Sequence, residues 1–155
     1  MKLERLVVMR EGDYDFRTGE LTRLGVGQIQ GLTSKLVQAT GKSRSVVVLT
    51  SPRLETVQSA KIVTDMFGIG KASEMPCLVS TPADGGDLDK VLRLVQSREN
   101  KHKTIILVTH AELARSFPVH YLEALGKHPV HCDVAQGQMV VAFPEAGNTV
   151  LVDFR

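Results

Sequence analysis

Short apolar runs alternate along the chain with longer segments that carry apolar side chains at helical spacing. The runs at residues 6–9, 45–49 and 104–108 are uninterrupted, and the last two are rich in β-branched residues. Runs of this length and composition are typical of strands buried on both faces of a parallel sheet. The sequence therefore predicts three such strands, each followed by a helical segment.

Four helices are predicted from apolar residues that recur every three or four positions. They lie between Thr22 and Gly41 and over residues 54–67, 88–95 and 111–125. The candidate N-caps of the first and third helices are Thr22 and either Asp84 or Asp87. Glycines end three of the four helices, at Gly41, Gly68 and Gly126.

The C-terminal part has a different pattern, in which two apolar segments flank a turn. Residues 138–143 and 149–154 lie on either side of the sequence PEAGN, which predicts an antiparallel hairpin. Residues 78–79 are predicted as a further short strand and residues 81–87 as a turn. The whole pattern predicts one α/β domain over residues 1–155, a three-layer sandwich whose mostly parallel central sheet has helices on both faces.

Length, charge and cysteine content restrict the class of protein. A chain of 155 residues suits one domain, and its net charge of +2 is too small for a dedicated nucleic-acid-binding protein. Cys77 and Cys132 lie in no metal-binding or disulfide pattern, and we expect no metal and no cofactor. The apolar run before Arg10 is too short for a signal peptide, and no segment has the roughly 18 apolar residues of a membrane span. We expect a cytoplasmic protein that binds neither nucleic acid nor membrane.

Polar side chains follow the three predicted parallel strands. Arg10 and Glu11 follow the first strand, Ser51 and Arg53 the second, and His110 the third. Because ligands of open α/β sheets bind at the carboxyl ends of the strands, where helix N-termini favour anions, these side chains are expected at one rim. The sequence therefore predicts a pocket for a phosphate or carboxylate group.

Each of these residues also has a structural interpretation. Arg10 is consistent with a surface charge, and His110 with a histidine whose hydrogen bonds are satisfied within the fold. Ser51 followed by Pro52 is typical of a helix N-cap and first turn. The other histidines lie in polar or loop segments and are interpreted as structural or solvated: His102, His120, His128 and His131.

Four motifs, in this order, resemble those of the phosphoglycerate-mutase-like histidine phosphatase superfamily. LVVMREGD resembles the first strand of the family, which ends in Arg-His-Gly and an acid, and LTRLGVGQ resembles LTxxGxxQ. SPRLETVQSA resembles SPxxRxxQTA, and ILVTH resembles the strand that carries a second histidine. The small size and the closing hairpin are most similar to the short bacterial SixA-like phosphohistidine phosphatases. The resemblance implies their fold and a bacterial source.

Two of the four pocket residues that the resemblance implies are replaced. Glu11 stands where the family has the histidine that accepts the phosphoryl group, and Glu55 stands where it has a phosphate-binding arginine. Arg10 and His110 remain, and Arg53 is a candidate substitute for the second arginine. With histidines neutral, the formal charge of the pocket changes from about +2 to about −1. A carboxylate about 4 Å from a phosphate charge repels it by about 4 kcal/mol at an effective dielectric of about 20.

These replacements predict a degenerate active site. We expect Glu11 to pair with His110 or Arg10 and close the pocket, and we expect the carboxylate of Glu11 to raise the pKa of His110. The expected function is a pseudophosphatase with a binding or regulatory role, whose partner is a phosphoprotein, a phosphate-like anion or another protein. The alternative is an active phosphohistidine or phosphoester phosphatase in which Arg10 and Arg53 bind phosphate and His110 is the acid/base. A third interpretation is a metal site at Glu11, Glu55 and His110.

Overall fold

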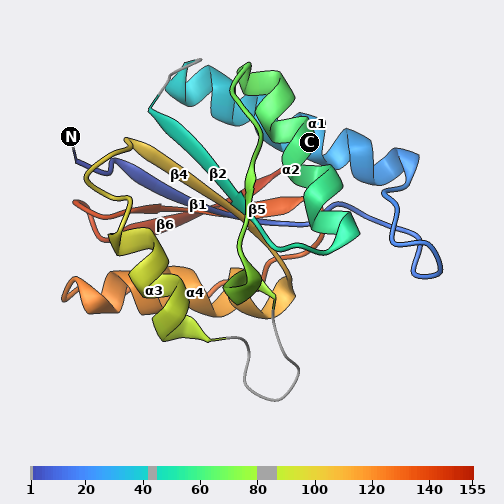
Figure 1. Ribbon diagram of the computed structural model, residues 1–155. Helices are drawn as coiled ribbons and strands as arrows, with labels where there is room; N and C mark the ends of the chain where they lie inside the picture. The colour runs from blue at the N-terminus through green and yellow to red at the C-terminus, as the bar shows by residue number, and fades with distance from the viewer. Residues whose placement is uncertain (1, 42–44, 80–86) are drawn as a thin grey trace.

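The computed structural model describes residues 2–41, 45–79 and 87–155, which form one mixed sheet between two layers of helices (Figure 1). The strands, in sheet order, are β3 (Ser73–Glu74), β2 (Val46–Thr50), β4 (Thr104–Thr109), β1 (Arg5–Arg10), β5 (Gln138–Phe143) and β6 (Asn148–Asp153). The helices are α1 (Arg23–Thr40), α2 (Leu54–Phe67), the short 3-10 helix η1 (Pro76–Leu78), α3 (Leu88–Gln96) and α4 (Ala111–Ala124).

The pairing of the strands confirms the predicted fold class. β3, β2, β4 and β1 are parallel neighbours, while β5 runs antiparallel to β1 and forms a hairpin with β6. This arrangement places the carboxyl ends of β1, β2 and β4 at the same edge of the sheet. The predicted alternation of strands and helices, followed by an antiparallel hairpin, is therefore correct.

Alternate residues of the central strands face two separate hydrophobic cores. Val7 and Met9 of β1 face α1 and α2, where they pack in one cluster with Ile29 and Leu32. Leu6 and Val8 of the same strand face α3 and α4 and belong to the other cluster. A strand buried on both faces needs apolar residues at every position, which is why these runs are uninterrupted.

The structure differs from the sequence prediction at the edge of the sheet. Residues 78–79, predicted as a strand, are the end of η1 and the residue after it, and the edge strand β3 lies earlier in the chain. Pro76 begins η1 and has no N–H for a ladder, and Leu78 O accepts a hydrogen bond from Thr109 Oγ1 at 2.6 Å. Of the two candidate caps of α3, Asp87 accepts from Lys90 N–H at 3.1 Å, while Asp84 and the predicted turn at 81–86 lie outside the described residues.

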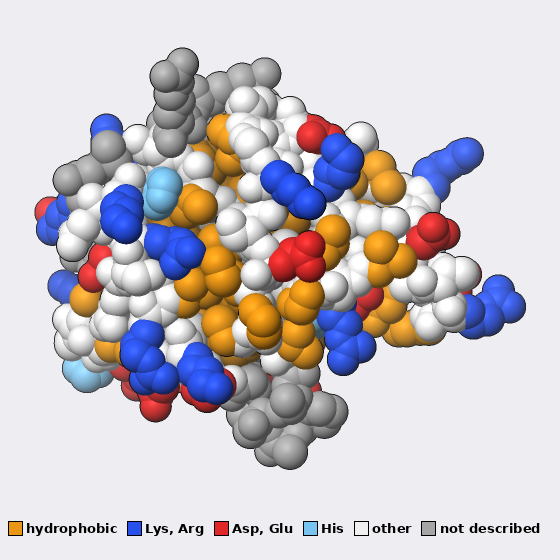
Figure 2. All heavy atoms as spheres, in the orientation of Figure 1, with side chains coloured by type: hydrophobic (Ala, Val, Ile, Leu, Met, Phe, Trp, Pro, Cys, Tyr) orange, Lys and Arg blue, Asp and Glu red, His pale blue; other side chains and the backbone are white. Residues whose placement is uncertain are grey.

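The face of the molecule seen in Figure 2 carries apolar side chains across its middle, between the two helical layers, with lysine and arginine side chains around them.

A cavity of about 360 Å³ at the sheet edge is lined by α2 and by the segment that leads into β3. Thr50 contributes to its wall, but Arg10, Glu11 and His110 do not. This cavity is therefore separate from the predicted anion pocket.

Across the described ranges, no helix has the length and apolar character needed to cross a membrane.

Candidate functional site

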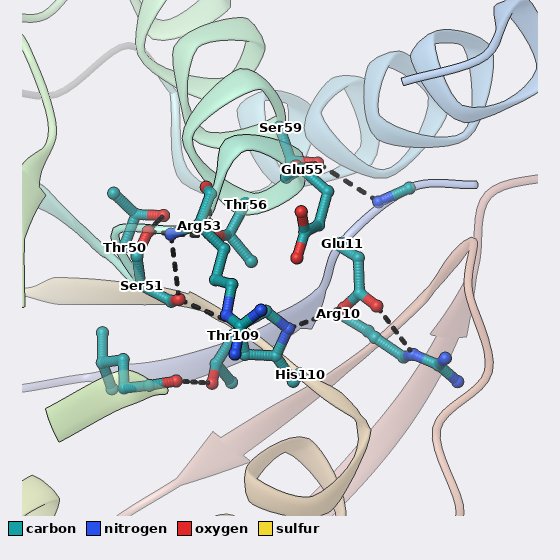
Figure 3. Close-up of polar contacts among 12 residues, drawn as sticks. Arg10, Glu11, Thr50, Ser51, Arg53, Glu55, Thr56, Ser59, Thr109 and His110 are labelled. Carbon is teal, nitrogen blue, oxygen red and sulfur yellow. Dashed lines mark hydrogen bonds and ion pairs between the residues drawn. The ribbon is translucent and has the colours of Figure 1, made fainter. Parts of the chain in front are cut away.

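Backbone hydrogen bonds join the ends of the three central strands. Glu11 N–H donates to Thr109 O at 3.1 Å, and Ser51 N–H donates to Val108 O at 3.0 Å. The residues that follow β1, β2 and β4 are therefore held side by side, as the sequence predicts. Figure 3 shows Arg10, Glu11, Ser51, Arg53 and His110 gathered at this edge, together with Glu55 from α2.

His110 is the N-cap of α4 and lies between two polar side chains (Figure 3). Its Nε2 atom is 2.9 Å from Ser51 Oγ, and its Nδ1 atom is 3.8 Å from Glu11 Oε2. The interpretation of Ser51 as a helix N-cap is wrong, because α2 is capped by Arg53 without a side-chain hydrogen bond. Ser51 Oγ instead accepts a long hydrogen bond from Arg53 N–H and makes the short contact with His110.

The imidazole of His110 favours its neutral form, contrary to expectation. Burial lowers the pKa of His110, and the positive charges of Arg53 and Arg10 lower it further. The carboxylate that raises this pKa is Glu55 and not Glu11 as predicted, and it does not offset burial, so the predicted increase is wrong. A neutral ring has one nitrogen that donates and one that accepts, which suits contacts with a hydroxyl and a carboxyl group.

Glu11 is only 3% exposed, at the end of β1. Its Oε1 atom is 3.6 Å from Arg10 Nε and its Oε2 atom is 3.8 Å from His110 Nδ1, so the predicted contacts exist but exceed hydrogen-bond length. Among the described residues, Arg10 Nε and Glu11 Oε2 are buried without a hydrogen-bond partner. Arg10 Nε–H therefore donates to no described residue, and Glu11 Oε2 is free to carry a proton.

Burial raises the pKa of Glu11 to about 7; Arg10 lowers this pKa, and the nearby Glu55 raises it. Glu11 therefore exchanges its proton near neutral pH, well above the range of an ordinary carboxyl group. The formal charge assigned to the pocket from the sequence counted Glu11 as fully ionised and is therefore too negative near neutral pH.

Glu55 and Arg53 come from the beginning of α2. Glu55 is 7% exposed and its carboxylate points into the cluster (Figure 3). Ser59 Oγ donates to Glu55 O at 2.7 Å and accepts from Gly12 N–H at 3.2 Å, which ties α2 to the loop after β1. Arg53 is exposed, but its charge lowers the pKa of His110, so its guanidinium lies near the ring.

The loop after β1 is held against the start of α1 by the LTRLGVGQ motif. A Cβ atom on Gly12 would lie 2.6 Å from Gly25 O, and a Cβ on Gly25 would collide with Asp13 O. Asp13 N–H donates to Gln28 Oε1 at 2.8 Å, while Thr22 Oγ1 caps α1 and donates to Asp13 Oδ2. The two glycines permit a close approach that fixes the backbone beside Glu11.

Three residues that the sequence did not indicate surround this cluster. Arg10 donates to Val134 O at 3.3 Å, and Gln136 donates a side-chain hydrogen bond that lowers the pKa of Glu11. Burial raises the pKa of Tyr14, and the charges of Glu11 and Glu55 raise it further, so Tyr14 belongs to the electrostatic surroundings of this cluster. Val134 and Gln136 lie in an irregular segment without a motif, so nothing in the sequence pattern marked them.

The third interpretation, a metal site, has no support within residues 2–41, 45–79 and 87–155. No group of three or more His, Cys, Asp or Glu side chains there is arranged to hold a metal ion. Glu11, Glu55 and His110 are close enough to affect one another's charge but do not form such a group.

Searches with protein-family models and among curated proteins find no match to this sequence. Solved structures do match. The protein histidine phosphatase SixA complexed with tungstate has a TM-score of 0.69 and 20% identity over 96% of this chain and 94% of that chain. A mycobacterial glucosyl-3-phosphoglycerate phosphatase complexed with VO3 has a TM-score of 0.66 and 15% identity over 97% and 98% of the two chains.

A phosphoglycerate mutase from Plasmodium falciparum is also similar, with a TM-score of 0.62 and 15% identity over 99% of this chain and 91% of that chain. The matches extend over nearly the whole length of both chains in each pair. Together with the strand order described above, they show that the chain has the fold of the SixA-like and phosphoglycerate-mutase-like histidine phosphatases.

Proposed function

We propose that this chain is a pseudophosphatase that binds a phosphorylated partner or a phosphate-like anion at the carboxyl edge of its sheet without hydrolysing it. The observation that carries the proposal is the position of Glu11. This side chain is buried between Arg10 and His110, at the place where the resemblance implies the phosphoryl-accepting histidine.

The chemistry of Glu11 supports a loss of turnover. Carboxylates do form acyl phosphates in other enzymes, but the carboxylate must then be ionised and reach the phosphorus atom. Glu11 is only 3% exposed, and burial raises its pKa to about 7, which favours its neutral form more than that of an ordinary carboxyl group. Glu55 adds a second carboxylate where the resemblance implies a phosphate-binding arginine. When Glu11 is ionised, as a nucleophile must be, both carboxylates repel the phosphate.

A binding role is supported by the groups that remain accessible. The side chains of Arg10 and His110 are 25% and 18% exposed, and Arg53 is exposed beside them. A guanidinium pair and an imidazole are suited to an oxyanion, whether it belongs to a free anion or to a phosphorylated protein. We assign the binding or regulatory role to these three side chains.

Turnover measurements test this proposal directly. The wild-type protein and His110→Ala are assayed with p-nitrophenyl phosphate and with a phosphohistidine-containing protein. We expect the rate of the wild type to equal that of the variant and of buffer. Turnover by the wild type that disappears in His110→Ala would refute the proposal.

One observation favours a second candidate, a phosphatase with rearranged chemistry. His110 keeps a neutral imidazole, a 2.9 Å contact with Ser51 Oγ and a partly exposed ring, which are the properties of a general acid or base. In that case Arg10 and Arg53 bind the phosphate, and the same assay shows activity that requires all three residues.

A further inference from the structure

We propose that Glu11 is a proton-dependent charge switch beneath an oxyanion site formed by Arg10, Arg53 and His110. The inference rests on the proposed binding role and specifies its ligand: an oxyanion such as sulfate or a phosphate ester, bound together with uptake of a proton. The oxyanion contacts the exposed parts of the three side chains, and Glu11 lies below them.

The first argument is the unsatisfied pair at the centre of the site. Arg10 Nε and Glu11 Oε2 are both buried, and neither has a hydrogen-bond partner among the described residues. The Arg10–Glu11 and Glu11–His110 contacts, at 3.6 Å and 3.8 Å, are ion-pair distances without hydrogen bonds. Glu11 is thus held close to both ligand-binding groups without being fixed by either.

The second argument is the charge of the groups that face Glu11. Arg10 comes from β1, His110 from the end of β4, and Glu55 from α2, while the neutral side chains of Gln136 and Tyr14 complete the surroundings. With Glu11 ionised, the two arginines Arg10 and Arg53 are balanced by the two glutamates. When Glu11 takes up a proton, the site gains one net positive charge and attracts an anion.

The third argument is that this proton is available near neutral pH. Burial raises the pKa of Glu11 to about 7, and removal of water from the carboxyl by a bound ligand acts in the same direction. Anion binding and protonation of Glu11 are linked. If protonation of Glu11 raises the affinity for the anion by some factor, the bound anion raises the affinity of Glu11 for the proton by the same factor. Anion affinity is therefore expected to fall as the pH rises above 7.

Sulfate binding measured by calorimetry tests the switch, because sulfate does not titrate near neutral pH. For the wild type, we expect the affinity to fall about fivefold from pH 7 to pH 8 and about tenfold for each further unit. Binding in two buffers with different ionisation enthalpies should show proton uptake. In Glu11→Gln, which mimics the neutral carboxyl, we expect binding as tight as that of the wild type at low pH, and unchanged from pH 6 to pH 9.

One variant controls for general charge effects, and a second tests the oxyanion site itself. Glu112→Gln removes one exposed carboxylate from the first turn of α4 and should leave the pH dependence of the wild type intact. Arg53→Ala should weaken sulfate binding at every pH. An arm with an O-phosphoserine peptide in place of sulfate distinguishes a free anion from a phosphorylated protein as the source of the oxyanion.

Three results would overturn the switch: no sulfate binding by the wild type at pH 6, affinity of the wild type that is independent of pH, or Glu11→Gln that binds no tighter than the wild type at pH 8. If Glu11→Gln does not fold, the pH dependence of sulfate affinity and the proton uptake of the wild type are sufficient to test the switch. Turnover in the phosphatase assay would refute the proposed function but leave the switch standing, so the two failures are distinguishable.

Discussion

The Nε2 atom of His110 lies 2.9 Å from Ser51 Oγ, and this contact joins the ends of the neighbouring strands β4 and β2. Ser51 is fully buried, so its hydroxyl is not exposed to solvent. Its role is to orient the imidazole, whose other nitrogen is then directed at Glu11. The orientation of His110 toward Glu11 therefore depends on Ser51, which the sequence shows only as the first residue of a Ser-Pro pair.

Replacing Ser51 with alanine should destabilise the protein by about 1–2 kcal/mol, because a buried hydrogen bond is lost and His110 Nε2 keeps no partner. Urea unfolding measures the loss. Ser97→Ala is the matched control: Ser97 is an exposed serine that donates to Leu94 O, and its loss should cost less than about 0.5 kcal/mol. Equal effects of the two substitutions would show that the Ser51–His110 contact contributes nothing specific.

Replacing Glu11 with glutamine should change the pH dependence of stability. The pKa of Glu11 rises from 4.5 to about 7 on folding, so the folded state binds the proton more tightly. The contribution of Glu11 to folding stability is therefore lost as the pH rises from about 4.5 to about 7, by up to about 3 kcal/mol, and this contribution does not change further above that range. Glu11→Gln lacks this loss.

The contribution of His110 has the opposite sign. Its lowered pKa means that stability is lost as the pH falls below about 6.5, because the unfolded state binds the proton more tightly. His110 is present in both proteins, so the difference between their unfolding free energies isolates Glu11. Urea unfolding at several pH values should show an advantage of Glu11→Gln that grows up to about pH 7; a difference that stays constant with pH would contradict the assignment.

Adding a methyl group at Gly25 should be far more damaging than adding one at Gly27. A Cβ on Gly25 meets the backbone of Asp13, which cannot move without displacing the loop after β1. We expect a loss of about 1–3 kcal/mol for Gly25→Ala. Gly27 has nothing within 4 Å of the added atom, so Gly27→Ala should be neutral or stabilising by up to about 1 kcal/mol. Thermal unfolding measures both variants. A melting temperature of Gly27→Ala that lies below that of Gly25→Ala would contradict the prediction.

Most of the fold could be predicted from local sequence features, namely uninterrupted apolar runs and glycines that end helices. The uninterrupted run at 104–108 could only be a strand or a buried helical segment, and its length and β-branched residues decide for a strand. α2 has the predicted bounds, because Gly68 adopts the left-handed conformation that ends a helix. The edge strand was misplaced because a two-residue strand has no periodicity to detect.

Only the meeting of the strand-end residues could be predicted from the sequence. The ends of parallel strands must meet, so Arg10, Glu11 and His110 were placed together correctly. The pKa directions were not accessible, because the burial of His110 and Glu11 depends on how three strand ends, α2 and the segment at Gln136 pack. The Ser51–His110 contact likewise joins residues 59 positions apart, which no local pattern encodes.

Restoring both replaced groups should restore phosphoryl transfer if degeneration is confined to the pocket. Glu11→His supplies a phosphoryl acceptor, and Glu55→Arg supplies a second phosphate-binding guanidinium. Glu11→His alone leaves Glu55 to repel the phosphate, and Glu55→Arg alone leaves no acceptor histidine. We therefore expect a strongly non-additive result, as for residues that act as one unit.

Formation of a phosphoenzyme from a phosphohistidine donor is the most direct test of the claim that replacement of these groups has removed catalysis from an otherwise intact histidine phosphatase fold. It is measured side by side in the wild type, Glu11→His, Glu55→Arg and the double variant, after circular dichroism has shown that each is folded. We expect a phosphoenzyme in the double variant, little or none in either single variant, and none in the wild type. Phosphorylation of the wild type, or a folded double variant that remains unphosphorylated, would contradict it.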